Sequence, residues 1–228
     1  MTSTRRAATI AGALFLVGTA AGVLSVVDAA DGPDYLRQLA ANGTQVVVGA
    51  LFQCAMALAY VGVAIALYPV LRTHSPTAAA VFLGFRIAAG MVNLIGVVIL
   101  LLLLDLSSQF VGSGAPASSH FQTLGGLLRS GRDLVNHVVM ILALSLGDAM
   151  YYWILRQARL VARWLSSWGF LGLLLTMSAS FLVLGRLIAV VTPTYVALNA
   201  VLFLQQLALA IWLIARGFNA PREALPLR

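Results

Sequence analysis

Charged residues are scarce in this sequence, and lysine is absent altogether. Only 9% of the residues are charged and 61% are hydrophobic, whereas soluble domains carry roughly 25% charged residues. A chain with this few charged residues cannot cover a surface that faces water. Its outer surface must therefore face lipid. All 14 basic residues are Arg, and the net charge is +7. Because most Arg residues lie between apolar runs, they indicate membrane topology and predict no nucleic-acid binding.

Residues that build catalytic or metal centres are also few. The single cysteine, Cys54, lies in an apolar run and cannot form an internal disulfide, and the only glutamate is Glu223. The motifs of zinc proteases, serine hydrolases and P-loop proteins are missing. Only His137 of the three histidines is in or near an apolar run, so a haem with two axial histidines is excluded. We therefore expect no catalytic or metal site and no haem, flavin or zinc cofactor.

Six apolar stretches are long enough to cross a membrane, which takes roughly 20 residues. They are residues 7–27, 45–71, 78–104, 134–155, 165–191 and 195–215. The first is too long for the apolar part of a cleaved signal peptide, so we expect it to be a span. No linker divides the stretches. The sequence therefore predicts an all-α transmembrane bundle of six spans in a single domain, residues 1–228.

The placement of Arg predicts the orientation, because Arg is enriched in short cytoplasmic loops. With a cytoplasmic N-terminus, three Arg residues fall in outer loops and nine fall on the inner side: Arg5, Arg6, Arg72, Arg156, Arg159, Arg163, Arg216, Arg222 and Arg228. All four Trp residues lie near inner ends of spans, as in an interfacial belt. Both termini are therefore predicted to be cytoplasmic.

The predicted outer links differ in length. Residues 105–133 form the longest, beginning with a Ser/Gly/Ala-rich stretch expected to be a flexible loop. Residues 120–133 are expected to form a short helix lying on the outer membrane surface. Residues 192–194 are expected to form a tight turn around Pro193.

Two opposite charges, Arg86 and Asp148, lie within predicted spans at nearly equal depth. Burying one such charge costs roughly 2.5–3.5 kcal/mol on insertion scales, and pairing offsets that cost. We therefore predict an intramembrane Arg86–Asp148 pair. It is either a clamp between helices or part of a gate or proton-linked site. Tyr151 and Tyr152 follow Asp148 by one turn and are candidates to hydrogen-bond it.

Further polar side chains recur on single faces of several spans and predict a polar seam inside the bundle. They are Gln53, Asn93, His137, Tyr151, Tyr152, Arg186, Asn199 and Gln206. Four of them fall in the outer third of their spans and predict a shallow outward-facing pocket: Gln53, His137, Arg186 and Asn199. The alternative is ordinary hydrogen bonding between helices, with Arg186 extending outward to the interface.

Gly18 and Gly22 form a small-xxx-small step in the first span. Such steps let helix backbones approach closely. The step marks a packing face, either within the chain or in a homo-oligomer.

Four stretches resemble an uncharacterised bacterial family of multi-pass integral membrane proteins, classed as a domain of unknown function. They are RRAATIAGALFLVGTAAGVLSVV, ALYPVLR, FRIAAGMVN and YYWILRQARLVARWLSSWGFLG. The last is the most specific, although family members often have Pro where Ala162 stands here. The resemblance implies a location in the bacterial plasma membrane and no established activity.

Two functional classes remain open. In the first, the protein binds or moves a small solute or lipid through the polar seam. In the second, it is a non-catalytic accessory or scaffold subunit whose polar seam only holds the bundle together. The lipid bilayer is the one partner that both imply.

Overall fold

The computed structural model describes residues 3–114 and 120–219, and all regular structure in these residues is helical. Six helical segments are long and apolar enough to cross a membrane. They are α1 (Ser3–Leu24), α3 (Gly43–Leu71), α4 (Pro76–Gly112), a rod of α5 (His120–Leu134), η2 (Val135–Val139) and α6 (Met140–Gln157), α7 (Arg163–Leu184) and α8 (Pro193–Ala215). Helices satisfy their own backbone polar groups, as lipid requires. The predicted all-α bundle with six spans is confirmed.

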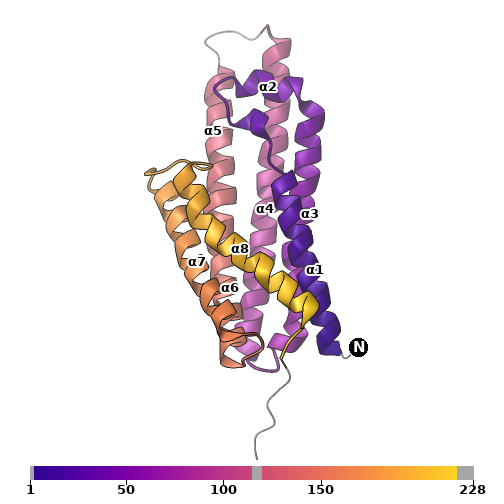
Figure 1. Cartoon of the computed structure of the whole chain (residues 1–228). Helices are drawn as coiled ribbons and strands as arrows, with labels where there is room; N and C mark the ends of the chain where they lie inside the picture. Colours follow the sequence, from indigo (N-terminus) through magenta and orange to yellow (C-terminus); the bar gives the residue numbers. More distant parts are fainter. Residues whose placement is uncertain (1–2, 115–119, 220–228) are drawn as a thin grey trace, which may run out of the picture.

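The six segments form a ring in which each contacts the next along the chain and α8 returns to α1. Figure 1 shows α8 crossing obliquely from the far end of α7 to the beginning of α1. We call the end with the start of α1 and the end of α8 the terminal end, and the opposite one the loop end. Gly12 makes this crossing close, because a Cβ there would lie 2.7 Å from the Ala210 carbonyl oxygen. Toward the loop end, α1 and α8 diverge (Figure 1).

The loop end carries a cap that extends past the tip of the α7–α8 hairpin (Figure 1). It consists of the 3₁₀ turn η1 (Asp28–Ala30), the short helix α2 (Tyr35–Ala41), α5 and the end of α4. The 37 residues of α4 span about 55 Å at ~1.5 Å per residue, more than the ~30 Å of a hydrocarbon core. Arg129 ties the cap together by donating to the carbonyl oxygens of Asp31, at 2.6 Å, and Gly32, at 3.3 Å.

The predicted outer link 105–133 is wrong in most of its described length. Its first part continues α4 as helix to Gly112, and residues 115–119 lie outside the described residues. Residues 120–133 do form a helix, but α5 continues through η2 into α6 and rises along α4 instead of lying on the membrane surface. Arg129 of α5 bonds the carbonyl oxygens of Asp31 and Gly32, and the Tyr35 hydroxyl of α2 donates to the Gln122 carbonyl oxygen of α5. These contacts hold α5 against the other parts of the cap.

The predicted fifth span, 165–191, is too long by seven residues. Helix α7 ends at Leu184, and Gly185 closes its last turn. Arg186 and Val191 then adopt left-handed φ angles of 57° and 64°, which turn the chain away from the helix axis. The link to α8 therefore covers 185–192 and is longer than the predicted turn 192–194, with the Thr192 hydroxyl capping α8 by accepting from the Tyr195 amide.

Candidate functional site

A buried ion pair joins α4 to α6. Arg86 Nε donates to Asp148 Oδ1, and Arg86 Nη2 donates to Asp148 Oδ2, each at 2.8 Å. Both side chains are at most 2% exposed. This bidentate geometry is the strongest arrangement available to an Arg and a carboxylate, and it offsets the desolvation of both charges. The structure thus brings these two residues together in the interior of the ring.

Aromatic rings surround the Arg86 guanidinium. The ring centroids of Phe15, Tyr60 and Phe82 lie 5.5, 5.7 and 5.5 Å from its Cζ. These rings come from α1, α3 and α4, so one cation contacts three spans while its counter-ion lies on a fourth. Cation–π contacts of this kind strengthen when water is excluded. The arrangement fits a clamp between helices.

The expectation that Tyr151 and Tyr152 hydrogen-bond Asp148 is wrong. The Tyr152 hydroxyl donates to Gln205 Oε1 at 2.6 Å, and Gln205 Nε2 donates to the Leu165 carbonyl oxygen at 3.1 Å. The buried Tyr151 hydroxyl makes no hydrogen bond within the described part of the chain. Tyr151 lies on the same face of α6 as Asp148, but its ring stacks on Phe82 of α4 with 5.1 Å between the ring centroids. Apolar side chains fill the rest of the ring interior toward the terminal end.

A cluster of three buried amides lies closer to the loop end. Gln53 Nε2 donates to Asn93 Oδ1 at 2.8 Å and to Asn136 Oδ1 at 3.2 Å, which links α3, α4 and η2. Gly96 leaves room for the Asn136 amide, because a Cβ there would lie 2.0 Å from Asn136 Oδ1. These are the interhelical hydrogen bonds expected of polar residues in membrane-spanning helices.

His137 lies in the π-helical turn η2, where the backbone bonding pattern shifts by one residue. Its Nδ1 is 2.8 Å from the Tyr195 hydroxyl of α8. The Ser180 hydroxyl of α7 donates to the His137 carbonyl oxygen at 2.8 Å. π-Turns leave carbonyl groups without their usual helical partner and often occur at functional sites. Here the turn fastens the rod to both helices of the α7–α8 hairpin.

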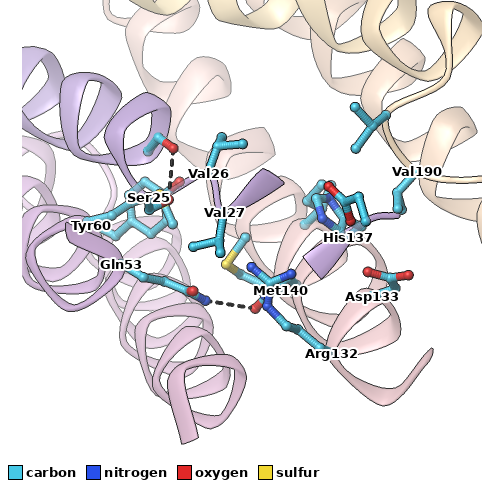
Figure 2. Close-up of a pocket in the computed structure, with 16 residues that line it drawn as sticks. Ser25, Val26, Val27, Gln53, Tyr60, Arg132, Asp133, His137, Met140 and Val190 are labelled. Carbon is cyan, nitrogen blue, oxygen red and sulfur yellow. Dashed lines mark hydrogen bonds between the residues drawn. The ribbon is translucent and has the colours of Figure 1, made fainter. Parts of the chain in front are cut away.

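A chamber of about 240 Å³ opens inside the ring near the loop end. We call it the mouth chamber. Figure 2 shows Gln53 and Tyr60 on one side and Arg132, Asp133 and His137 across from them. The rest of its lining is mostly apolar: Gly22, Ser25, Val26, Val27, Asp31, Met56, Asn136, Met140, Ile141, Val190 and Val191. The Arg132 Nε is buried and has no hydrogen-bond partner in the described residues.

A second chamber of about 220 Å³ lies deeper in the membrane region, and we call it the deep chamber. Tyr60, Met140 and Ile141 line both chambers, so the two adjoin. The deep chamber is also lined by Leu144, Ser145, Leu173, Thr176, Asn199, Leu202, Phe203 and Gln206. Each chamber is smaller than a typical small-molecule site, and the two joined reach the lower part of the usual range of roughly 300–1,000 Å³.

Thr176 has an unusual position in the deep chamber. Its side chain is 4% exposed, and its hydroxyl has no hydrogen-bond partner in residues 3–114 and 120–219. Ser and Thr in membrane helices usually bond the carbonyl oxygen four residues earlier, as the exposed Ser178 does on the same helix. A buried hydroxyl without a partner costs roughly 1–3 kcal/mol. Thr176 thus lines the deep chamber and carries a hydroxyl that no group in the described residues satisfies.

The four residues expected to share one outer pocket are divided by the structure. Gln53 and His137 line the mouth chamber, whereas Asn199 lines the deep chamber. Arg186 is exposed beyond the end of α7 and lines neither chamber; it lines an open hollow that shares Asp133 and Val190 with the mouth chamber. The early end of α7 causes this separation, because it removes Arg186 from the span that was to carry it.

Several lining residues were missed in the sequence. Asn136 and Ser145 lie on the same rod as His137 and Asp148, so extending the polar-face argument along that span would have found them. Arg132 and Asp133 belong to the outer link, where the sequence predicts a short helix on the membrane surface and no part in a pocket. Thr176 carries no sequence signal, because a lone Thr in an apolar span is common and only packing shows that its hydroxyl is unpartnered.

Gly18 and Gly22 both face α3 within the chain. A Cβ on Gly18 would lie 3.1 Å from the Ala59 Cβ, and one on Gly22 would lie 3.1 Å from the Met56 Sδ. The small-xxx-small step is therefore used for close packing of α1 on α3. Among the described residues, no group of three or more His, Cys, Asp or Glu is placed to hold a metal ion.

The ring of apolar helices, with charges paired or placed at its ends, defines a polytopic α-helical membrane protein. The profile of one protein family, described as a domain of unknown function (DUF4386), matches residues 10–217. The chain belongs to this family, which confirms the resemblance noted in its sequence. No curated protein and no solved structure matches the chain.

Proposed function

We propose that the protein binds a small amphiphilic molecule, a lipid or lipid-like solute, in the joined mouth and deep chambers. The observation that carries this proposal is the buried, unpartnered hydroxyl of Thr176 in a half-open chamber. The lining supports it too, because a largely apolar surface with a few convergent polar groups is typical of small-molecule sites.

The proposed orientation places the loop end outside the cell and both termini in the cytoplasm of a bacterium, with the bundle in the plasma membrane. Seven described Arg residues lie at the terminal end: Arg5, Arg6, Arg72, Arg156, Arg159, Arg163 and Arg216. The loop end holds four Arg residues and five Asp residues. This asymmetry favours the assignment under the positive-inside rule. The chambers then receive their ligand from the outer side or the outer leaflet.

Binding is better supported than passage across the membrane. Toward the terminal end, the Arg86–Asp148 pair and its aromatic neighbours fill the ring interior. A moved solute would have to displace fully buried side chains and separate a bidentate ion pair, which is costly. The six spans and their seam therefore form a single binding domain open on one side.

A second candidate is a scaffold or accessory subunit whose polar seam is purely structural. The amide cluster of Gln53, Asn93 and Asn136 favours it, because these side chains bond one another across three elements. A seam evolved only to hold helices would be satisfied in this way throughout. The Tyr151 hydroxyl also lacks a partner, but Tyr151 is packed against Phe82 and lines neither chamber. Thr176 lacks a partner and lines the deep chamber, and for this reason we place ligand binding first.

Native mass spectrometry of the protein purified in mild detergent tests the choice. We expect wild type to retain an amphiphile and Asn199→Phe, which fills the deep chamber, to lose it. Val196→Phe is the matched control, because Val196 lies on the same helix and is exposed. Equal retention by both variants would contradict binding in the chambers and favour the scaffold.

A further inference from the structure

We infer that the group buried in the deep chamber is uncharged, so that the ligand is a neutral lipid whose polar end is a hydroxyl or a carbonyl group. This inference rests on the proposed function and adds the chemical class of the ligand. It derives from the kinds of atoms in the two chambers and from their depth in the membrane.

The polar side chains of the deep chamber are all uncharged. They are the hydroxyls of Tyr60, Ser145 and Thr176 and the amides of Asn199 and Gln206. Hydroxyls and amides can donate to a ligand hydroxyl or carbonyl oxygen and can accept from a ligand hydroxyl. The remaining lining is apolar, with Leu202 and Phe203 on the α8 side. A ligand carrying a full charge would find no counter-ion on these walls.

The nearest charges in the ring are already neutralised. Arg86 and Asp148 bond each other through two hydrogen bonds and are at most 2% exposed. The ring of Tyr60 lies over the guanidinium and also lines the chamber. Recruiting either charge for a ligand would leave the other unpaired in a buried site, which is expensive. The ion pair therefore does not serve as a headgroup receptor.

Of the two chambers, only the mouth chamber is lined by charged side chains, which are Asp31, Arg132 and Asp133. Along α5, η2 and α6, Arg132 and Ser145 are separated by about 20 Å at ~1.5 Å per residue. A charged headgroup bound at the mouth would thus leave only a hydrocarbon chain for the deep chamber, and the Thr176 hydroxyl would stay unsatisfied. A neutral polar end placed there supplies the missing partner.

The depth of the chamber agrees with a neutral ligand. Ser145 lies 12 residues before the end of α6, and Thr176 lies 13 residues after the start of α7, which is about 20 Å from the terminal end at ~1.5 Å per residue. That is well inside a ~30 Å hydrocarbon core. Charged groups remain at the interface because burial at this depth is costly, whereas burying an uncharged hydroxyl or carbonyl group costs much less, least when it is hydrogen-bonded.

A series of amphiphiles that share a 16-carbon chain and carry a neutral, an anionic or a cationic polar end tests this inference. Full-length protein in phosphatidylcholine nanodiscs is titrated with photoreactive forms of 1-hexadecanol, hexadecanoic acid and hexadecyltrimethylammonium. Mass spectrometry then locates the crosslinks and measures their saturation. We expect the alcohol to label deep-chamber residues saturably and the acid and the ammonium to bind there at least tenfold more weakly.

Thr176→Val reports on the proposed hydrogen bond. We expect it to weaken alcohol binding roughly two- to tenfold, the effect of one neutral hydrogen bond. Valine is nearly isosteric and removes an unpartnered hydroxyl, so the variant should fold as well as wild type. Ser178→Ala on the same helix, whose hydroxyl is exposed and bonds Leu174 instead, should leave binding unchanged.

The outcomes separate the two proposals. Saturable labelling of the deep chamber by the acid or the ammonium, at affinity equal to or above that of the alcohol, overturns the neutral-ligand inference and leaves the binding function intact. Equal binding of the alcohol to wild type and Thr176→Val also overturns the inference. If none of the three probes labels the chambers saturably, the binding function itself fails.

Discussion

The ring of Tyr60 lies over the guanidinium of Arg86, with 5.7 Å between the ring centroid and Cζ, and the same Tyr60 lines both chambers. The Tyr60 side chain thus lies between the two chambers and the buried ion pair. A ligand that moves Tyr60 would alter the packing around the ion pair. Loss of the ion pair would in turn loosen the wall that Tyr60 forms in both chambers.

The Arg86–Asp148 pair gives the first prediction. Arg86→Ala and Asp148→Ala should each destabilise the protein by about 3–5 kcal/mol, because each leaves a buried charge unpaired. The double variant should recover part of this loss. Thermal unfolding in detergent and expression level measure the effect, with Arg72→Ala at the exposed terminal end as the control. Single variants as stable as wild type would contradict a buried pair.

The same variants distinguish a clamp from a functional site. If the double variant regains both stability and ligand binding, the pair is structural. If it regains stability but binds no ligand in the native mass spectrometry assay, the charges take part in function.

Gly96 gives the second prediction. Gly96→Ala should be destabilising because its Cβ would lie 2.0 Å from Asn136 Oδ1 and would force Asn136 away from Gln53. Gly84→Ala is the matched control on the same helix, where nothing lies within 4 Å of an added Cβ. Ala is the better helix former by about 1 kcal/mol, so Gly84→Ala should be neutral or stabilising. Unfolding temperatures of the two variants that do not differ would argue against the amide cluster.

Two hydroxyls on α7 give the third prediction. Ser180→Ala removes the donor to the His137 carbonyl oxygen and should cost roughly 1–3 kcal/mol. Thr176→Val removes a hydroxyl that has no partner in the described residues and should leave the free energy of unfolding unchanged or raised. Unfolding of the ligand-free protein is the measurement. A loss at Thr176→Val as large as that at Ser180→Ala would mean that Thr176 has a structural partner.

Topology gives the fourth prediction. Reporter fusions at Ser113 and Arg159 should fall on opposite sides of the membrane, with Ser113 outside, because these residues lie at the loop end and the terminal end. Alkaline phosphatase and fluorescent-protein fusions read the two sides. An external location for the link between α6 and α7 would reverse the proposed orientation and place the chambers on the cytoplasmic side.

Hydropathy and charge placement were sufficient to predict the spans, because lipid imposes the same requirement along every helix. They failed at residues 187–191, which are as apolar as the helix before them although α7 ends at Leu184. They failed again at residues 120–133. This segment packs along α4, and its Arg129 bonds the Asp31 carbonyl oxygen instead of facing a membrane surface. The partners of Tyr152 and the isolation of Thr176 depend on packing between distant helices, which no single stretch of sequence contains.

The close crossing at Gly12 has a consequence for biosynthesis. Because α8 is translated after the other five spans, the ring can close only when Ala210 reaches Gly12 on the first of them. Helix α8 also supplies Asn199, Leu202, Phe203 and Gln206 to the wall of the deep chamber. The deep chamber is therefore complete only after the last span has been made and has packed on the first, so a chain truncated before α8 would lack one wall of the binding site.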